Sequence, residues 1–539
     1  MTNVLQRSVI VMFCFSMTVI FNNAHAAGKT AESSVSYLAA VRAYADTMLE
    51  KGRDRWGGVQ SPLFVSMLDR RTHELWDFKH ITRWTHENSG VEIVSYKKKG
   101  KQMHGFGAPA SDRMPDSANL GHDEHLYLTL YRLSDVTGDA NYAESADAAL
   151  RYFWLNCQDA NTGMMAWGEH MAWHLPEDTW WSSAREGHSR IHEPAPWPAE
   201  LWDRCYAMGD EVQEALKKYA MGVWKWQVAN HEKAWTNRHV YPDGFPNVAR
   251  KGREYPRLVG QFCRYWTDAY AHSSDEAFRA EMIKGIESFV SNSIRRAKPN
   301  GALPFGTAEK LQNYYQLTHQ FIMLRRLHYA LGVVPDETGT EIRKLMAMTE
   351  AVILDKLDHH LDPAAEYPGY LRAAEADTLN PGDARKKHQG KENWNDLSIA
   401  YTGTWNTPIV ALHMLDYYEQ TGNERFRELG LKGADLVLAL TGDEPEYPEN
   451  MRPYEMAKAV QMMVKSWDIT GDRKYLDQGE CFGRDAIPMF TDDISPLPAV
   501  MALPNKYHKR IYEARTGGDD LMFALLQLHE AVAAQDAGK

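Results

Sequence analysis

The sequence predicts an all-α fold in which helical hairpins close into an (α/α) toroid of six or seven hairpins, preceded by an irregular N-terminal segment. The first observation is a recurring pattern: an apolar helix, a Thr-Gly turn ending in Asp or Asn, an aromatic residue and a second helix. The second is that none of the 539 residues form a βαβ pattern or a nucleotide-binding glycine loop. Each hairpin has to bury one face against its neighbours, so the hairpins close into a ring or stack into a solenoid. We favour one ring over residues 27–539, because no Pro/Gly/Ser-rich linker divides the chain.

Residues 1–26 have the pattern of a secretory signal peptide. Arg7 supplies a positive charge, residues 8–21 are apolar, and Ala24-His25-Ala26 is a small-x-small cleavage pattern. The apolar run is too short for a transmembrane helix, and no later stretch qualifies. We therefore expect cleavage after Ala26, no membrane insertion, and a periplasmic or secreted protein.

Helical periodicity predicts the elements that follow. A helix is expected over 35–51, and residues 52–118 are expected to be irregular. Further helices are expected over 125–136, 142–156, 211–230, 260–270, 276–296, 311–331, 399–418, 426–440 and 475–487. The repeated turns are Thr137-Gly138-Asp139, Thr421-Gly422-Asn423 and Thr470-Gly471-Asp472, with weaker copies at Ser273-Ser274-Asp275 and near Thr338-Gly339. The glycine ends one helix and the Asp or Asn caps the next. Loops on one rim would then form the site.

Charge and cysteine usage exclude some functions. The formal net charge of -12 argues against nucleic acid as a partner. One basic stretch stands out, formed by Arg238, Arg250, Lys251, Arg253, Arg257 and Arg264. It fits either a funnel for an anionic ligand or a solvated, salt-bridged loop. The four cysteines after the leader form no CxxC pair, so we interpret them as buried small apolar residues.

Three residues could hold a metal ion: His170, Glu193 and His239. Imidazole and carboxylate are ligands that a zinc- or manganese-type ion prefers, and such a set leaves coordination positions open for a substrate. Their separations of 23 and then 46 residues let successive hairpin loops deliver one ligand each, so we expect all three at helix–loop junctions. The competing interpretation is of ordinary loop histidines and a helix-capping glutamate. Further histidines compete as ligands: His174, His188 and His192.

With Arg238 directly before His239, this order resembles polysaccharide lyase family 2, the pectate lyases with an (α/α)7 toroid. The resemblance covers roughly residues 50–260, and residues 56–69 are similar to the entry segment of pectate-lyase-like proteins. It implies a divalent transition metal such as Mn or Zn held by His170, Glu193 and His239. It also implies Arg238 as the catalytic base.

The chemistry that the resemblance implies is β-elimination on an acidic polysaccharide. The metal would bind a uronic acid carboxylate and acidify the hydrogen on C5. A guanidinium is normally always charged, so a tyrosine base stays open. The tyrosine candidates are Tyr241, Tyr314, Tyr315, Tyr367 and Tyr401. The expected substrate-binding residues are Arg250, Arg257, Arg264, Trp173 and Tyr401.

Two other classes of function remain open. A glycoside hydrolase on the same toroid would need two facing carboxylates, for which Asp243, Glu366 and Asp396 are candidates. A related enzyme would be a dehydratase or lyase acting on another acidic glycan, such as a marine sulfated uronan. A non-catalytic glycan-binding helical repeat protein would keep the aromatic residues but would not need the His, Glu and His set. The pattern specifies neither the individual uronan nor an oligomeric state.

Overall fold

The computed structural model describes most of the chain after the leader. The described residues are 37–75, 81–85, 92–96, 116–168, 171–182, 191–192, 197–236, 239–240, 256–303, 314–359, 370–372, 406–441, 447, 451–502 and 510–538. The expected signal peptide lies outside these ranges. Among the described residues, no helix combines the length and apolar character needed to cross a membrane.

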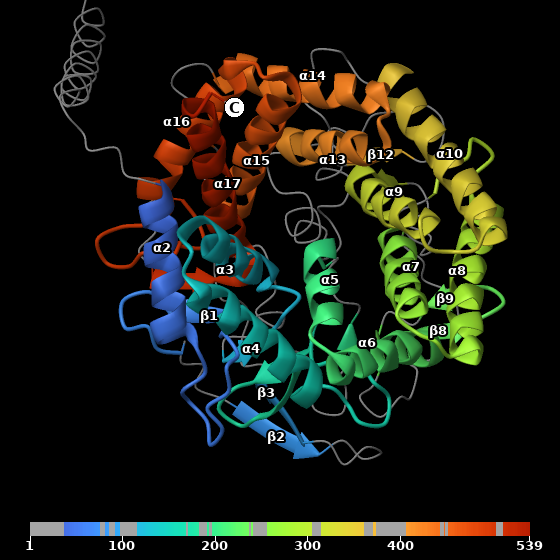
Figure 1. Ribbon diagram of the computed structural model, residues 1–539, viewed down its shortest axis with the longest axis horizontal. Helices are drawn as coiled ribbons and strands as arrows, with labels where there is room; N and C mark the ends of the chain where they lie inside the picture. The colour runs from blue at the N-terminus through green and yellow to red at the C-terminus, as the bar shows by residue number, and fades with distance from the viewer. Residues whose placement is uncertain are drawn as a thin grey trace, which may run out of the picture.

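The described helices form a ring of seven pairs around a central opening (Figure 1). The inner helices are α3 (Glu124–Thr137), α5 (Ala199–Ala207), α7 (Pro256–Ala271), α9 (Leu317–Leu331), α13 (Asn406–Thr421), α15 (Pro453–Thr470) and α17 (Gly518–Asp536). Their outer partners, in the same order, are α4 (Ala140–Asn156), α6 (Asp210–Gly222), α8 (Glu276–Arg296), α10 (Asp336–His359), α14 (Glu424–Thr441), α16 (Arg473–Phe490) and α2 (Tyr37–Thr47). The assignment follows from the central cavity, whose lining residues come from or directly adjoin the inner helices. The predicted (α/α) toroid is confirmed.

The ring closes by joining its first and last helices. Helix α17 packs against α15 on one side and against both α2 and α3 on the other (Figure 1). The Tyr44 hydroxyl of α2 donates a 2.7 Å hydrogen bond to Asp519 of α17. Strand β1 (Met67–Asp69) also pairs antiparallel with β13 (Ile511–Glu513). Because these contacts join segments more than 400 residues apart, the two ends of the described chain stabilise each other.

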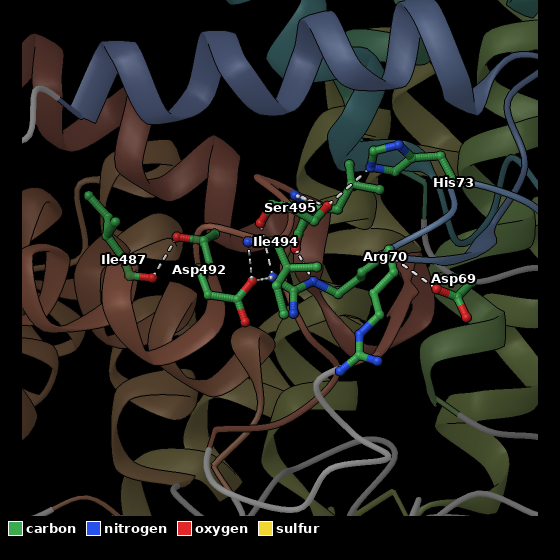
Figure 2. Close-up of polar contacts among 10 residues, drawn as sticks. Asp69, Arg70, His73, Ile487, Asp492, Ile494 and Ser495 are labelled. Carbon is green, nitrogen blue, oxygen red and sulfur yellow. Dashed lines mark hydrogen bonds and ion pairs between the residues drawn. The ribbon is translucent and has the colours of Figure 1, made fainter.

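A buried arginine reinforces this closure (Figure 2). Arg70, directly after β1, donates from Nε to the Leu497 carbonyl at 2.6 Å and from Nη2 to Asp492 at 2.9 Å. It also donates to the Ser495 carbonyl at 3.0 Å. A guanidinium with almost no exposed surface needs such partners, because an unpaired buried charge is costly. Arg70 therefore fixes the start of the chain to the connection between α16 and α17.

The two rims of the ring are connected differently. Successive helices alternate in direction, so every inner-to-outer connection lies on one rim and every outer-to-inner connection on the other. The first rim has turns of two to four residues between consecutive helices, and we call it the short-turn rim. The second carries connections such as 157–198 and 360–405, and we call it the long-loop rim.

The short-turn rim confirms most of the predicted turn chemistry. Gly138, Gly422 and Gly471 have φ of 72°, 69° and 67°, the left-handed conformation that ends a helix. Asp139, Asp275 and Asp472 each accept backbone N–H groups of the next helix. The copy expected near Thr338-Gly339 was wrong: those residues lie inside α10, and the turn is at 332–335.

Short strands are the main feature that the sequence did not predict. A five-stranded sheet has the order β2-β3-β6-β5-β4, formed by Ile81–Thr85, Glu92–Tyr96, Thr179–Ser182, Met171–His174 and Ser117–Ala118. Two-stranded pairs are β7 (Ile191–His192) with β10 (His239–Val240), β8 (Val228–Asn230) with β9 (Trp235–Thr236), and β11 (Tyr314–Gln316) with β12 (Tyr370–Arg372). Residues 52–118, expected to be irregular, thus contain strands, and the helix expected over 211–230 gives way to a π-helical turn (Val223–Gln227) and β8. Strands of two to five residues are too short to show a periodic pattern.

An aromatic cluster supports the long connection between α4 and α5. Trp154, Trp167, Trp197, Trp202 and Tyr219 pack with ring centroids 5.0 to 6.2 Å apart. Edge-to-face contacts of this kind add stability beyond the buried area. These tryptophans form core rather than a sugar-binding surface. The four described cysteines are buried and unpaired, as predicted.

Candidate functional site

Most of the predicted site residues lie outside the described residues, but their chain neighbours are described. This group comprises His170, Glu193, Arg238, Tyr241, Arg250 and Tyr401. Strand β5 begins at Met171, directly after His170, and β7 ends at His192, directly before Glu193. His239 is placed as the first backbone position of β10.

The pairing of β7 with β10 sets the predicted ligand His239 opposite His192, one of the competing candidates. His239 lies opposite His192, and Val240 lies opposite Ile191, in an antiparallel pair. Opposed Cα atoms in such a pair are roughly 4.5–5.5 Å apart. Glu193, the next residue in the sequence, lies outside the described residues. The expectation that His239 lies at a helix–loop junction was wrong, because it lies in a strand.

A buried asparagine binds the described backbone on both sides of His170. Asn119 donates from Nδ2 to the carbonyl oxygens of Gly168, at 2.8 Å, and Met171, at 3.1 Å. Its Oδ1 accepts the N–H groups of Gly121, at 3.1 Å, and Gly168, at 3.3 Å. Three of these four hydrogen bonds tie Gly168 and Met171 to Asn119, which lies shortly before α3 begins at Glu124. Sequence analysis did not single out Asn119, because its role depends on contacts nearly 50 residues away.

Two residues of β5 that the sequence offered for the site are buried in the sheet. His174, a competing ligand, is fully buried, and its Nε2 lies 3.4 Å from the Asp116 carboxylate. Trp173 is 9% exposed and lies opposite Trp180 of β6. These positions favour a packing role for both side chains. The sugar contact of Trp173 stays a prediction.

The two described arginines of the basic stretch are also buried. Arg264 is 2% exposed, and it forms ion pairs with Asp268 at 2.6 Å and Asp203 at 2.9 Å. Arg257 lies in the first turn of α7, with Nη1 3.4 Å from His319 Nε2. For Arg264 the salt-bridged interpretation applies, although the residue does line the central cavity.

The central cavity, of about 790 Å³, gathers charged groups at the ends of the inner helices on the long-loop rim. His125 Nδ1 lies 3.7 Å from Glu124 Oε1 and 3.5 Å from Asp520 Oδ1. Lys458 Nζ lies 3.2 Å from Asp520 Oδ1. Figure 1 shows why these residues meet: α3, α15 and α17 are neighbours where the ring closes.

The surroundings shift the pKa values of the two carboxyl groups of this cluster in opposite directions. Burial, and then the Asp520 charge, raise the pKa of Glu124 well above its ordinary value. Burial also opposes ionisation of Asp520, but His125 and Lys458 outweigh it and lower the pKa of that carboxyl. Burial lowers the pKa of His125 to about 4, so this imidazole is neutral at pH 7. A pair of carboxyl groups whose pKa values are pushed apart is the arrangement that acid–base catalysis uses.

The sequence did not reveal this pair. Glu124 and Asp520 each stand in the first turn of a helix, where an acidic residue is common because it interacts with the helix dipole. The carboxylates proposed for a hydrolase were Asp243, Glu366 and Asp396, and all three lie outside the described residues. Only closure of the ring brings Glu124 and Asp520 together, and no local signal predicts that contact.

Within the described part of the chain, no group of three His, Cys, Asp or Glu side chains is placed to hold a metal. Of the predicted set of His170, Glu193 and His239, the structure describes only the backbone of His239. The metal site therefore stays a prediction. The structure describes the strand register at His239 and the hydrogen bonds from Asn119 on both sides of His170.

Comparison with known proteins supports a glycan-processing enzyme on an (α/α) toroid. A family model described as periplasmic pectate lyase matches residues 100–251, which confirms the resemblance inferred from the sequence. Among solved structures, the α-1,2-mannosidase from Trichoderma reesei superposes with a TM-score of 0.51 at 10% identity, covering 91% of this chain and 93% of that one. This likeness shows the fold. An unsaturated glucuronyl hydrolase specific for heparin matches with a TM-score of 0.45 at 9% identity, covering 94% and 99% of the two chains.

Proposed function

We propose that the protein is an exported, metal-dependent polysaccharide lyase that cleaves a uronic-acid-containing glycan, pectate-like in type, by β-elimination. The register of β7 with β10 carries the proposal, because it sets His192, the residue before Glu193, opposite His239. The matched family segment supports it, since residues 100–251 contain His170, Glu193, Arg238 and His239. The periplasmic description of that family agrees with the expected leader peptide.

The donor set suits a transition metal such as Mn or Zn. His170, Glu193 and His239 would supply two imidazole nitrogens and a carboxylate, and they would leave positions for substrate oxygen. When bound, the metal supplies a Lewis acid that draws electron density from the uronate carboxylate. Asn119 would keep His170 in place by fixing the turn around it.

The chain's own residues then move the proton. Arg238, or Tyr241 if the base is a tyrosine, takes the proton from C5. The electron pair forms the C4–C5 double bond, and the bond from C4 to its oxygen breaks. Arg250 and Arg257 would bind neighbouring carboxylates through their guanidinium groups, as would Arg264. Arg264 contributes less, because its guanidinium is already paired with two aspartates.

The first test is absorbance at the wavelength of unsaturated uronides. The mature protein is mixed with polygalacturonate and other uronans, with manganese or with chelator. We expect a metal-dependent rise on one uronan, and a loss of more than about 100-fold in His239→Ala. His272→Ala is the matched control: it lies at the short-turn rim, where its ring stacks on Tyr206 at 4.2 Å.

The outcomes separate the competing classes. A rise that survives exhaustive chelation would exclude metal dependence, and an equal loss in both histidine variants would exclude a specific role for His239. Binding of a uronan without any turnover would point to the non-catalytic glycan-binding protein. Release of reducing ends without absorbance would point to hydrolysis rather than elimination.

A further inference from the structure

We propose that the central cavity is a second, hydrolytic site, in which Glu124 donates a proton to a glycosidic bond of an acidic oligosaccharide and Asp520 activates the attacking water. This activity is distinct from the proposed β-elimination. It uses neither the predicted metal ligands nor Arg238. The inference rests on the geometry of the cavity where α3, α15 and α17 meet.

The two carboxyl groups lie close together beside His125. Glu124 Oε1 and Asp520 Oδ1 lie 3.7 Å and 3.5 Å from the same nitrogen, His125 Nδ1. Because both oxygens contact one atom, they are at most about 7 Å apart, which is compatible with the carboxyl separations of roughly 5–9.5 Å that glycoside hydrolysis uses. Their side chains remain 17% and 10% exposed, and both line the cavity, where a bound sugar would meet both groups.

The environment gives each carboxyl group its role. Glu124 Oε2 is buried and has no hydrogen-bond partner among the described residues, a setting that disfavours the ionised carboxylate. Burial and the nearby Asp520 charge favour the protonated form by raising the pKa of Glu124. Asp520 is kept ionised by the Lys458 ammonium, 3.2 Å away, which leaves it able to accept a proton from water.

The cavity also indicates the class of substrate. Its volume of about 790 Å³ is within the range of roughly 300–1,000 Å³ that is typical of ligand sites. Arg326 lines it and donates to the Trp197 carbonyl, but it has no carboxylate within ion-pair distance among the described residues. This guanidinium is close enough to Glu124 to act on its ionisation. An acidic sugar would supply the missing counter-charge, which favours an oligosaccharide containing uronic acid.

The reaction balances without a cofactor. Glu124 transfers its proton to the glycosidic oxygen while the bond from that oxygen to C1 breaks. A water molecule forms the new C1–O bond and gives one proton to Asp520. Proton exchange with solvent then restores Glu124 to its neutral form and Asp520 to its ionised form.

The test uses short uronic-acid oligosaccharides and a nitrophenyl uronide with the full-length mature protein. We expect the wild type to release reducing ends without a matching rise in uronide absorbance. Glu124→Gln and Asp520→Asn should each slow this release by more than about 100-fold. A nitrophenyl leaving group needs no proton, so it should restore turnover in Glu124→Gln but not in Asp520→Asn. A purely structural role for Glu124 would not produce that rescue.

Asp536→Asn is the matched control. Asp536 is a carboxylate on the same helix, α17, but it is exposed and is not among the residues that line the cavity. It should keep full hydrolytic activity. Thermal unfolding of each variant separates misfolding from lost chemistry, and Glu124→Asp provides a second variant that retains the acid.

Failure of this proposal differs from failure of the lyase proposal. If the wild type releases no reducing ends beyond those of unsaturated products, the hydrolytic site is wrong whatever the absorbance shows. If hydrolysis survives Glu124→Gln, or fails equally in Asp536→Asn, the assignment of the acid is wrong. His239→Ala should abolish absorbance and leave hydrolysis intact, so each activity is scored independently.

Discussion

The ends of the helices differ between the short-turn rim and the long-loop rim. On the short-turn rim a left-handed glycine ends one helix and an aspartate caps the next, as at Gly471 and Asp472. A side chain added at Gly471 would meet nothing within 4 Å. On the long-loop rim, helices α3 and α17 begin with Asp123 and Asp519, which are almost completely buried. The short-turn rim joins consecutive helices through short turns. The long-loop rim, where the candidate sites lie, contains carboxyl groups whose burial lowers the stability of the fold.

The largest expected difference between the two rims is the unfolding free energy lost by burying a carboxyl group on the long-loop rim. Burial raises the pKa of Asp519 to about 7, against the hydrogen bonds it accepts from Tyr512 and Tyr44. Asp520, beside it, and Asp123 add to the charge around this position. The folded state therefore holds a proton that the unfolded state releases near pH 4. Stability from Asp519 is complete below that pH, and about 2–4 kcal/mol is lost as pH rises to 7.

Asp519→Asn removes this titration while keeping an oxygen to accept from both tyrosines. We expect the fall in unfolding free energy between pH 4 and pH 7 to become shallower, and the variant to be more stable than wild type at pH 7–8. Chemical denaturation across the pH range measures both effects. Asp139→Asn, at the short-turn rim, is the control and should leave the slope unchanged. An identical slope in Asp519→Asn would show that Asp519 is ionised in the folded protein at all these pH values.

The second prediction concerns the turn on either side of His170. Asn119→Ala deletes four hydrogen bonds and leaves backbone groups of Gly168 and Met171 unpaired. We expect a loss of about 1–3 kcal/mol in unfolding free energy. If His170 binds a metal, uronide formation should also fall at least about tenfold, because small displacements of a reacting group are costly.

A matched variant on the other rim tests whether that second effect is local. Asp275→Ala removes two hydrogen bonds that cap α8. It should destabilise the protein by about 1 kcal/mol without changing kcat/KM. An unchanged rate of uronide formation in Asn119→Ala, measured well below its unfolding temperature, would show that the hydrogen bonds of Asn119 are not needed for catalysis.

The same comparison explains how far the sequence could be interpreted. Helix periodicity and the repeated turns are local signals, so the toroid and its short-turn rim were predictable. The strands of the long-loop rim span two to five residues and depend on partners far along the chain, as His239 depends on His192. The pair of Glu124 and Asp520 depends on ring closure. The order of His170, Glu193 and His239 was visible in the sequence, but their arrangement is long-range.

The smallest effect is expected from breaking a single short turn. Gly471 has φ of 67° with open space around it, so Gly471→Ala meets no steric clash and loses only backbone preference. We expect a cost of about 1–2 kcal/mol, and a smaller one for Gly471→Asn, because asparagine tolerates the left-handed conformation. Neither variant should alter uronide formation or reducing-end release. Thermal unfolding together with both activity assays checks this. A selective loss of activity in Gly471→Asn would contradict the assignment of both sites to the long-loop rim.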